Sequence, residues 1–503
     1  MKILLTTLNS KFIHSNLALK YLYSVVAPAY VDVEVKEFTI NNEPSYVYGE
    51  ILRGDYDMVC FSCYIWNIEQ TVRLCEKLRK AEPEMIITFG GPEVSYDYVE
   101  FLQNHKFLDV IIRGEGEYPF YRLCKAMLTG DKDISQIPGL AYRQGGKIFV
   151  NEDQEVADFE RIPFPYKTME VEDDKIIYYE SSRGCPFRCS YCLSSIDKSI
   201  RALPLDRVRS DLGYFLYKKV KQVKFIDRTF NFDRERAYEI FKFLIENDNG
   251  VTNFHMEMCG DLLDEKTLQL LAKARKGLFQ FEIGIQTTNP MTLAAVNRNE
   301  NVYPVLFNVK KLLEMGNIHI HVDLIAGLPY EDYKSFERSF NKVYALGADN
   351  LQLGFLKLLK GTKIRLEEDK YQYQYEDHAP YQVISNKFIS AREIVRLKMI
   401  EEVLDLYKNR GGFDRTLDYY LDEKGMEPFA FFQMLADYYY DNGFQHASHK
   451  KEDLYRILYK MVWDQNQDQP VELAKIQGLL MEDMDHTLNF DAVKRFIKKG
   501  WEI

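Results

Sequence analysis

The sequence has no long apolar run. No stretch approaches the ~18 residues that a membrane-spanning helix needs, and the short run ILLTTL behind Met1 and Lys2 turns polar at Asn9. We therefore expect neither a signal peptide nor a membrane span. Cysteine is also scarce. Eight cysteines in 503 residues, five of them scattered, exclude a disulfide scaffold and predict a reduced, cytoplasmic protein.

Positive charge is in deficit. The 65 lysines and arginines against 76 acidic residues give a net charge of −11 and an isoelectric point near 5.5. This balance argues against a protein that coats nucleic acid. The chain is too long for one hydrophobic core, so we expect two or three domains.

Short apolar runs alternate with amphipathic stretches from residue 1 to 130. The runs 2–8, 57–64, 85–91 and 109–116 predict buried strands that end in glycine or polar loops, and 68–83 predicts a helix that stops at a proline. This order predicts an α/β domain, doubly wound around a mostly parallel sheet. Ligands bind beyond the carboxyl ends of the strands in such sheets, so these loops predict one ligand site.

A second alternating region follows a hairpin and linker at 131–172. Six candidate strands separated by helical stretches predict a partial (β/α)6 barrel over 173–365, with its chemistry at the C-terminal mouth. From 366 to 503 the pattern is helical. The aromatic stretch 418–440 there predicts helical core, with a substrate lid as the alternative. The six candidate strands are 175–182, 222–227, 254–260, 279–286, 319–329 and 350–359.

Three cysteines follow the first barrel strand in a CxxxCxxC spacing: Cys185, Cys189 and Cys192. A structural zinc site needs four closing ligands, and no second pair lies nearby. A redox pair formed by Cys189 and Cys192 would leave Cys185 without a role. A [4Fe–4S] cluster fits best, because three thiolates leave one iron open to chelate an amine and a carboxylate. Arg183 and Arg188 place positive charge beside such a cofactor.

The stretch CPFRCSYC resembles the signature of the radical S-adenosylmethionine (SAM) enzymes, with Tyr191 as its aromatic residue. The resemblance covers about 170–365. It implies that the open iron binds the methionyl end of SAM and that an electron cleaves SAM to methionine and a 5′-deoxyadenosyl radical. It also implies an electron donor such as a flavodoxin or ferredoxin as partner.

Further residues of the barrel follow from the same resemblance. The stretch FIDRTFN stands where the family often has a GGE-like motif, so its polar residues are candidates only. EIGIQTTNP resembles the family's fourth strand, and GLP at 327–329 resembles the turn against the adenine. For each position the alternative is a structural polar group of the barrel. The candidate SAM contacts are Asp227, Arg228, Asn231, Glu257, Glu282, Gln286 and Arg298.

The N-terminal region resembles the Rossmann-like, cobalamin-binding domain found in front of some radical SAM barrels. GGPEVS contributes Gly90, Gly91 and Glu93, and GEGE contributes Gly114 and Glu115. Glycine pairs after strands are common turn devices on their own. The resemblance places Ser62 beside the nucleotide tail of the cobalamin, and Tyr64 or Trp66 below the cobalt.

One departure from that pattern concerns histidine. The D-x-H-x-x-G stretch that supplies a cobalt-binding histidine is absent, and His14 is the one histidine in a plausible loop. We expect His14 to form hydrogen bonds rather than bind metal. As the alternative, the domain has kept the cobalamin-binding fold but no longer binds cobalamin.

These features predict a cobalamin-dependent radical SAM enzyme, with methyl transfer as the commonest reaction of such architectures. One alternative is a radical enzyme whose N-terminal domain binds substrate or a partner instead of cobalamin. Another is an iron–sulfur redox sensor with an inert barrel. The substrate could be a small metabolite, a peptide or an RNA nucleoside, and the acidic charge disfavours RNA.

Overall fold

The computed structural model describes residues 1–28, 32–130, 133–154, 158–197, 199–298 and 301–501. The chain divides into two compact units. Unit 1 comprises Met1–Gln280 together with Lys357–Glu367 and Glu376–Gln382. Unit 2 comprises Phe281–Leu356, Glu368–Tyr375 and Val383–Ile503. No helix among the described residues is long and apolar enough to cross a membrane.

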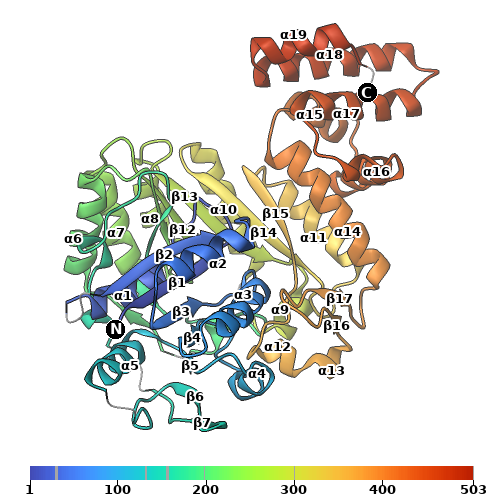
Figure 1. Ribbon diagram of the computed structural model, residues 1–503. Coiled ribbons are helices and arrows are strands. Elements are labelled where there is room, and N and C mark those ends of the chain that lie inside the picture. The colour runs from blue at the N-terminus through green and yellow to red at the C-terminus, as the bar shows by residue number, and fades with distance from the viewer. Residues whose placement is uncertain (29–31, 131–132, 155–157, 198, 299–300, 502–503) are drawn as a thin grey trace. The chain divides into compact units, whose positions relative to one another are not determined.

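The N-terminal sheet of unit 1 has seven strands in the order β2-β1-β3-β4-β5-β6-β7 (Figure 1). Strands β1 to β5 pair in parallel, as the alternating pattern predicts. The strands are β1 Ile3–Asn9, β2 Val33–Thr39, β3 Met58–Ser62, β4 Ile86–Gly90, β5 Val110–Ile112, β6 Leu140–Gln144 and β7 Lys147–Val150; the helices are α1 Leu17–Val26, α2 Pro44–Arg53, α3 Ile68–Ala81, α4 Tyr98–Asn104 and α5 Glu117–Thr129.

Helices cover both faces of this sheet. Leu4 on β1 packs in a cluster with residues of α2, α3 and α4, whereas its neighbours Ile3 and Leu5 pack with residues of α1 and α5. Alternate residues of a strand point to opposite faces, so one strand supplies both cores. The doubly wound arrangement follows, and it directs the carboxyl ends of β1, β3, β4 and β5 to one edge of the sheet.

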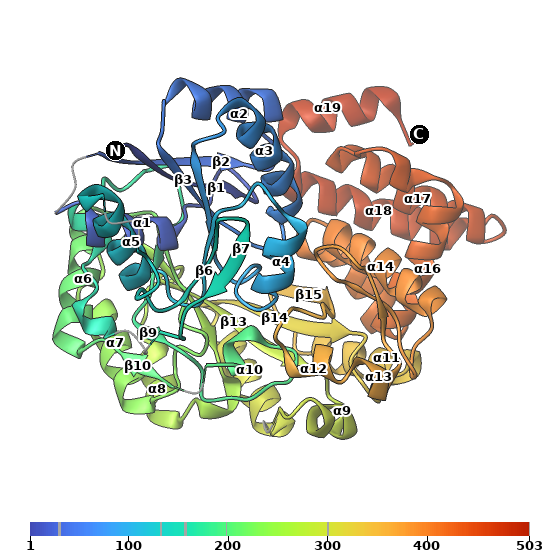
Figure 2. The same ribbon diagram turned by 60° about the horizontal axis from the view of Figure 1, so that its bottom comes forward.

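Two features of this sheet differ from the sequence-based picture. Strand β2 was not foreseen, because an edge strand that alternates charged residues is only partly buried. The predicted hairpin is present as β6 and β7, but it pairs antiparallel with β5 and extends the sheet (Figure 2).

A second sheet has six strands in the order β15-β14-β13-β12-β11-β8, the sequential order of a partial barrel. All six lie within or beside the predicted ranges. The unit boundary falls inside β13. The strands are β8 Ile177–Tyr179, β11 Gln222–Phe225, β12 Asn253–Met258, β13 Phe279–Gln286, β14 His319–Ala326 and β15 Asn350–Phe355; the helices are α6 Leu205–Tyr217, α7 Arg234–Glu246, α8 Glu265–Leu271, α9 Pro290–Ala295, α10 Val302–Met315 and α11 Tyr333–Tyr344.

The C-terminal part of unit 2 is helical, apart from the short strands β16 and β17. Its aromatic stretch is core rather than lid: Phe429 and Phe432 on α16 are buried and stack edge-to-face on Phe340 of α11, with ring centroids 5.4 and 6.1 Å apart. The elements are α13 Glu368–Tyr371, β16 Gln374–Tyr375, β17 Val383–Ser385, α14 Ala391–Leu404, α15 Asp414–Asp418, α16 Pro428–Asp441, α17 Lys451–Gln465, α18 Pro470–Thr487 and α19 Phe490–Lys499; the short helix α12 Lys363–Leu366 before them belongs to unit 1.

Candidate functional site

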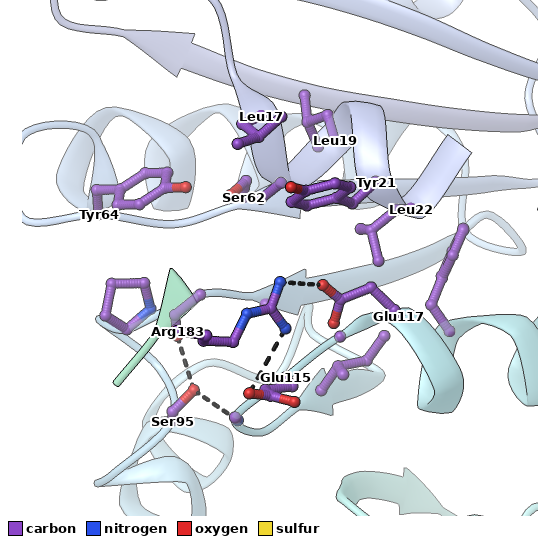
Figure 3. A pocket seen from close by; sticks show the side chains of 18 of the residues that line it. Leu17, Leu19, Tyr21, Leu22, Ser62, Tyr64, Ser95, Glu115, Glu117 and Arg183 are labelled. Atoms are coloured by element: carbon purple, nitrogen blue, oxygen red, sulfur yellow. Dashed lines mark hydrogen bonds and ion pairs between the residues drawn. The ribbon is translucent and has the colours of Figure 1, made fainter. Parts of the chain in front are cut away.

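A cavity of about 400 Å³ opens at the carboxyl edge of the N-terminal sheet, and all of its lining belongs to unit 1 (Figure 3). One wall comes from α1 and from the loops after β3, β4 and β5. Further lining comes from Glu180, Ser182 and Arg183, in the segment that leads into the cysteine loop. The cavity therefore lies directly beside the residues that carry the three thiols. Six of the residues predicted for the N-terminal domain line it: Ser62, Tyr64, Gly90, Gly91, Gly114 and Glu115.

Three predicted residues of this region do not line the cavity. Trp66 stacks on Tyr64 with ring centroids 4.4 Å apart and is 44% exposed. Glu93 is buried and binds Lys360 and Tyr381 instead. His14 forms a hydrogen bond between its Nδ1 and the Tyr178 hydroxyl at 2.6 Å, as its hydrogen-bonding interpretation predicts.

Gly91 keeps one wall of the cavity open. Its φ of +105° lies in the left-handed region, and a Cβ there would lie 2.5 Å from the carbonyl oxygen of Cys63. The neighbouring Cys63 amide donates to the Gly90 carbonyl at 2.7 Å, which holds the loops after β3 and β4 together. Only glycine fits this close approach, so the backbone itself faces the cavity.

Arg183 is the centre of the cavity's charge network. Its guanidinium binds both carboxylate oxygens of Glu180, at 3.0 and 2.9 Å, and Glu117 Oε1 at 2.9 Å. Glu115 lies 3.5 Å away and is also held by Arg201. Burial raises the pKa of Glu180 even though Arg183 lowers it. Burial alone would lower the pKa of Arg183, but Glu117 and Glu180 raise it well above its usual value, so the guanidinium stays charged.

The cysteine loop is held together by hydrogen bonds to its own backbone carbonyls. Cys185 and Cys189 are buried and Cys192 is half-buried. The Arg188 guanidinium donates to the carbonyls of Cys185 and Phe187 at 2.9 and 3.2 Å, so it closes the loop rather than pointing away from it. The Cys192 amide donates to the Cys189 carbonyl at 3.1 Å.

The donor set suits an iron–sulfur cluster better than a single metal ion. No three His, Cys, Asp or Glu side chains in the described part of the chain converge to hold one ion. A [4Fe–4S] cluster gives each thiolate its own iron, so its ligands stand apart. Three thiols on one short, largely buried loop fit that requirement.

Asp227 and Asn231 are used to build the site's frame. Asp227 is fully buried, and it accepts the amide and hydroxyl of Ser181 and the hydroxyl of Ser182, all within 2.7 Å. Burial raises the pKa of Asp227 against the opposing effect of these donors. Asn231 exchanges two 2.8 Å hydrogen bonds with the backbone of Cys259. Both residues therefore have hydrogen-bond partners within the protein. This agrees with the alternative interpretation, in which each is a structural polar group of the barrel.

The other candidates on these strands differ in their surroundings. Arg228 lines the cavity. Tyr191 in the cysteine loop and Glu257 on β12 are half-buried, and the Glu257 carbonyl accepts the Phe230 amide at 2.9 Å.

In unit 2, three predicted residues gather at the end of β13. Glu282 and Gln286 share the half-buried face of the strand, and Arg298 donates to the carbonyl of Gly284 between them at 2.5 Å. Gln286 has a φ of +68°, and its Oε1 is buried with no hydrogen-bond partner among the described residues. A buried amide oxygen without a partner is suited to accept a hydrogen bond from a donor group of a bound ligand.

A buried carboxylate that the sequence did not reveal supports this turn. Glu331 Oε1 accepts the hydroxyls of Thr287 and Ser339 at 2.6 and 3.2 Å. Those hydroxyls in turn accept the backbone amides of Asn289 and Thr288 at 3.0 Å. Burial raises the pKa of Glu331 to about 7. Glu331 follows directly on the GLPY stretch, but its neighbours in the sequence give no sign of burial.

Comparison with known proteins matches three regions of the chain. The B12 binding domain matches residues 3–124, the radical SAM superfamily matches 179–343, and a protein family of unknown function, DUF4080, matches 369–501. The cobalamin-dependent radical SAM methyltransferase TokK of Streptomyces tokunonensis is 25% identical over 63% of this chain and 49% of its own length.

A carbapenam methyltransferase and a solved structure extend this picture. The 2-(S-pantetheinyl)-carbapenam-3-carboxylate methyltransferase of Streptantibioticus cattleyicolor is 25% identical over 58% of this chain and 45% of its own length. The chain thus spans about half the length of these curated relatives. The cobalamin-dependent radical enzyme OxsB, solved with aqua-cobalamin bound, aligns with a TM-score of 0.66 and 14% identity over 100% of this chain and 84% of its own, so it shares the fold. Residues 179–343 thus match the radical SAM superfamily, with a B12 binding domain before them and a DUF4080 region after them.

Proposed function

We propose that the protein is a cobalamin-dependent radical SAM enzyme that transfers a methyl group to its substrate. The observation that carries this proposal is the adjacency, inside unit 1, of the three-thiol loop and the cavity at the carboxyl edge of the B12-type domain. The methyltransferase relatives support the same reaction class. When bound, the cluster and SAM would supply the radical and cobalamin would carry the methyl group.

The chain's residues divide between these groups. Cys185, Cys189 and Cys192 would hold the cluster. Glu282, Gln286 and Arg298 would bind SAM, where a guanidinium suits a carboxylate. The backbone at Gly90 and Gly91 would approach the cobalamin tail, with Ser62, Tyr64, Gly114 and Glu115 around it.

The cellular setting and domain borders belong to the same proposal. All eight cysteines lie in the described residues, and no disulfide joins them there. This supports a cytoplasmic location. The electron that cleaves SAM would come from a flavodoxin or ferredoxin. We place the domains at 1–130, 131–172, 173–365 and 366–503.

The deciding experiment uses the full chain, purified without oxygen and reconstituted with iron and sulfide. It is incubated with dithionite, SAM and hydroxocobalamin. We expect 5′-deoxyadenosine from the wild type and from Cys124→Ala, which removes a buried thiol elsewhere, but none from Cys185→Ala. A ¹³C-methyl label on SAM then identifies the methylated product among candidate acceptors.

A second pair of variants tests the cavity. Gly91→Ala should lower cobalamin binding at least tenfold, because its Cβ would clash with the Cys63 carbonyl. Gly49→Ala, which meets no atom within 4 Å, serves as the control. Deoxyadenosine without bound cobalamin would assign the N-terminal domain to substrate or a partner. If protein with an intact cluster never yields 5′-deoxyadenosine, even when candidate acceptors are present, the proposal that it is a radical SAM enzyme is contradicted.

A further inference from the structure

Two short segments that follow the last barrel strand in the sequence form part of unit 1. Residues 357–367 and 376–382, which we call the strap, belong to unit 1, although the sequence between and after them belongs to unit 2. Within the strap, the Leu358 amide donates to the Tyr381 carbonyl at 3.0 Å, and Lys357 bridges to Gln382. The Arg365 guanidinium lies over the Tyr381 ring at 4.8 Å and donates to the Leu358 carbonyl at 2.9 Å. The two segments therefore act as one piece.

The strap is anchored to the loop after β4 by a buried ion pair. Lys360 Nζ lies 3.3 Å from Glu93 Oε1, with the two side chains 12% and 3% exposed. The Tyr381 hydroxyl donates to the same oxygen, and Lys360 also approaches the Glu93 carbonyl at 3.4 Å. A buried charge pair is costly to break because the remaining charge loses its partner. The anchor thus fixes where the strap meets this loop.

Close packing reinforces the anchor at the cavity wall. Gly361 has a φ of +79°, and a Cβ there would lie 2.4 Å from the ring of Tyr96. Tyr96 follows Glu93 in the same loop and lines the cavity. The strap backbone therefore lies against the ring that forms part of the cavity wall.

The other end of the same short stretch holds the cysteine loop. The Ile364 amide donates to the Ser190 carbonyl at 2.9 Å, and Ile364 is fully buried. Ser190 stands between Cys189 and Tyr191. Between the two contact points, the Thr362 amide and hydroxyl both donate to the Leu359 carbonyl, at 3.2 and 2.6 Å, which makes the stretch a tight turn.

We propose that the strap is a positioning element that sets the cysteine loop against the cavity, with Glu93, Lys360 and Tyr381 as its positioning residues. The inference rests on the proposed function in that it treats both loops as cofactor loops. Five residues, Lys360 to Ile364, connect the cavity loop to the cluster loop. A disturbance of the anchor at Glu93 is transmitted to the thiols.

Hydrogen–deuterium exchange of the full, reconstituted protein tests the coupling without any turnover. We compare the wild type with Lys360→Met and with Tyr381→Phe, which removes a single hydroxyl. We expect exchange to rise at least tenfold in peptides covering both 90–97 and 185–195 in Lys360→Met, and by less in Tyr381→Phe. Arg79→Met is the matched control, because it breaks the ion pair with Asp109 in the same domain, away from the strap. It should leave 185–195 unchanged.

Release of iron to a chelator provides the second readout. Lys360→Met should lose its cluster iron several-fold faster than the wild type and the Arg79→Met control. Faster exchange confined to 90–97, or iron release at the wild-type rate, would overturn the proposal. If Lys360→Met fails to fold, Tyr381→Phe carries both measurements. Neither readout depends on SAM cleavage or bound cobalamin, so failure here is distinct from failure of the proposed function.

Discussion

Glu331 shows how a single residue can set the pH response of the site. Its carboxylate terminates a chain of hydrogen bonds that fixes the turn after Gln286, yet burial raises its pKa to about 7 from the usual 4.5 of a glutamate. A group whose pKa is raised by folding binds more protons in the folded state, so stability falls as pH rises from the lower value to the higher one.

We expect Glu331→Gln to abolish this dependence, because an amide does not titrate. The difference of 7 − 4.5 = 2.5 pH units corresponds to about 3 kcal/mol. The variant should therefore gain that much stability relative to the wild type between pH 4.5 and pH 8. Urea unfolding at pH 5.5 and 8.5 measures most of it. A relative stability that is equal at the two pH values would show that Glu331 titrates normally.

Other residues of the site differ in how readily the sequence reveals them. The three cysteines are recognisable because their spacing lies within one loop, and Gly91 because a glycine pair ends a strand. The roles of Glu117, Glu331 and Lys360 depend on partners distant in the sequence, and no local pattern encodes those contacts.

At the scale of elements, the turn from β8 into the cysteine loop depends on Asp227. This residue at the end of β11 accepts three hydrogen bonds from Ser181 and Ser182. The barrel strands themselves were predictable from their apolar runs. The strand β2 was not, because its exposed edge position removes the apolar signal.

Asp227→Ala should misplace the cysteine loop. Leaving a buried amide and two hydroxyls without their acceptor should cost about 3 kcal/mol. We expect iron and sulfide content after reconstitution to fall below a third of the wild-type value. Asp227→Asn is the matched variant, since its amide can still accept the Ser181 N–H and donate to the hydroxyls. Equal iron loading of Asp227→Ala and the wild type would show that Asp227 does not position the cysteine loop.

At the scale of the molecule, the Arg183 network joins parts of unit 1 that are far apart in the sequence: Glu115 and Glu117 around the start of α5, Glu180 and Arg183 before the cysteine loop, and Arg201 after it. Alternation of strands and helices predicted both sheets. It could not predict this network or the strap, because each arises from contacts between segments that the pattern treats separately.

Arg183→Met should destabilise the protein by about 3–5 kcal/mol at pH 8, since Glu117 and Glu180 would remain buried without their cation. Without Arg183, burial would raise the pKa of Glu180 further, so the folded variant would bind a proton there more readily than the unfolded chain and the deficit should shrink as pH falls toward 5.5. Chemical unfolding at both pH values measures this. Arg53→Met, which removes an exposed pair with Glu50, should cost at most about 1 kcal/mol.

The aromatic contact between α11 and α16 has a practical consequence for truncation. Residues 369–501 match a family model of their own, yet Phe429 and Phe432 share one core with Phe340 and Tyr344 of α11. A gene cut short after the barrel would present those rings to water as an apolar patch. We expect such a fragment to be recovered in inclusion bodies, and its solubility to return when the missing C-terminal piece is co-expressed.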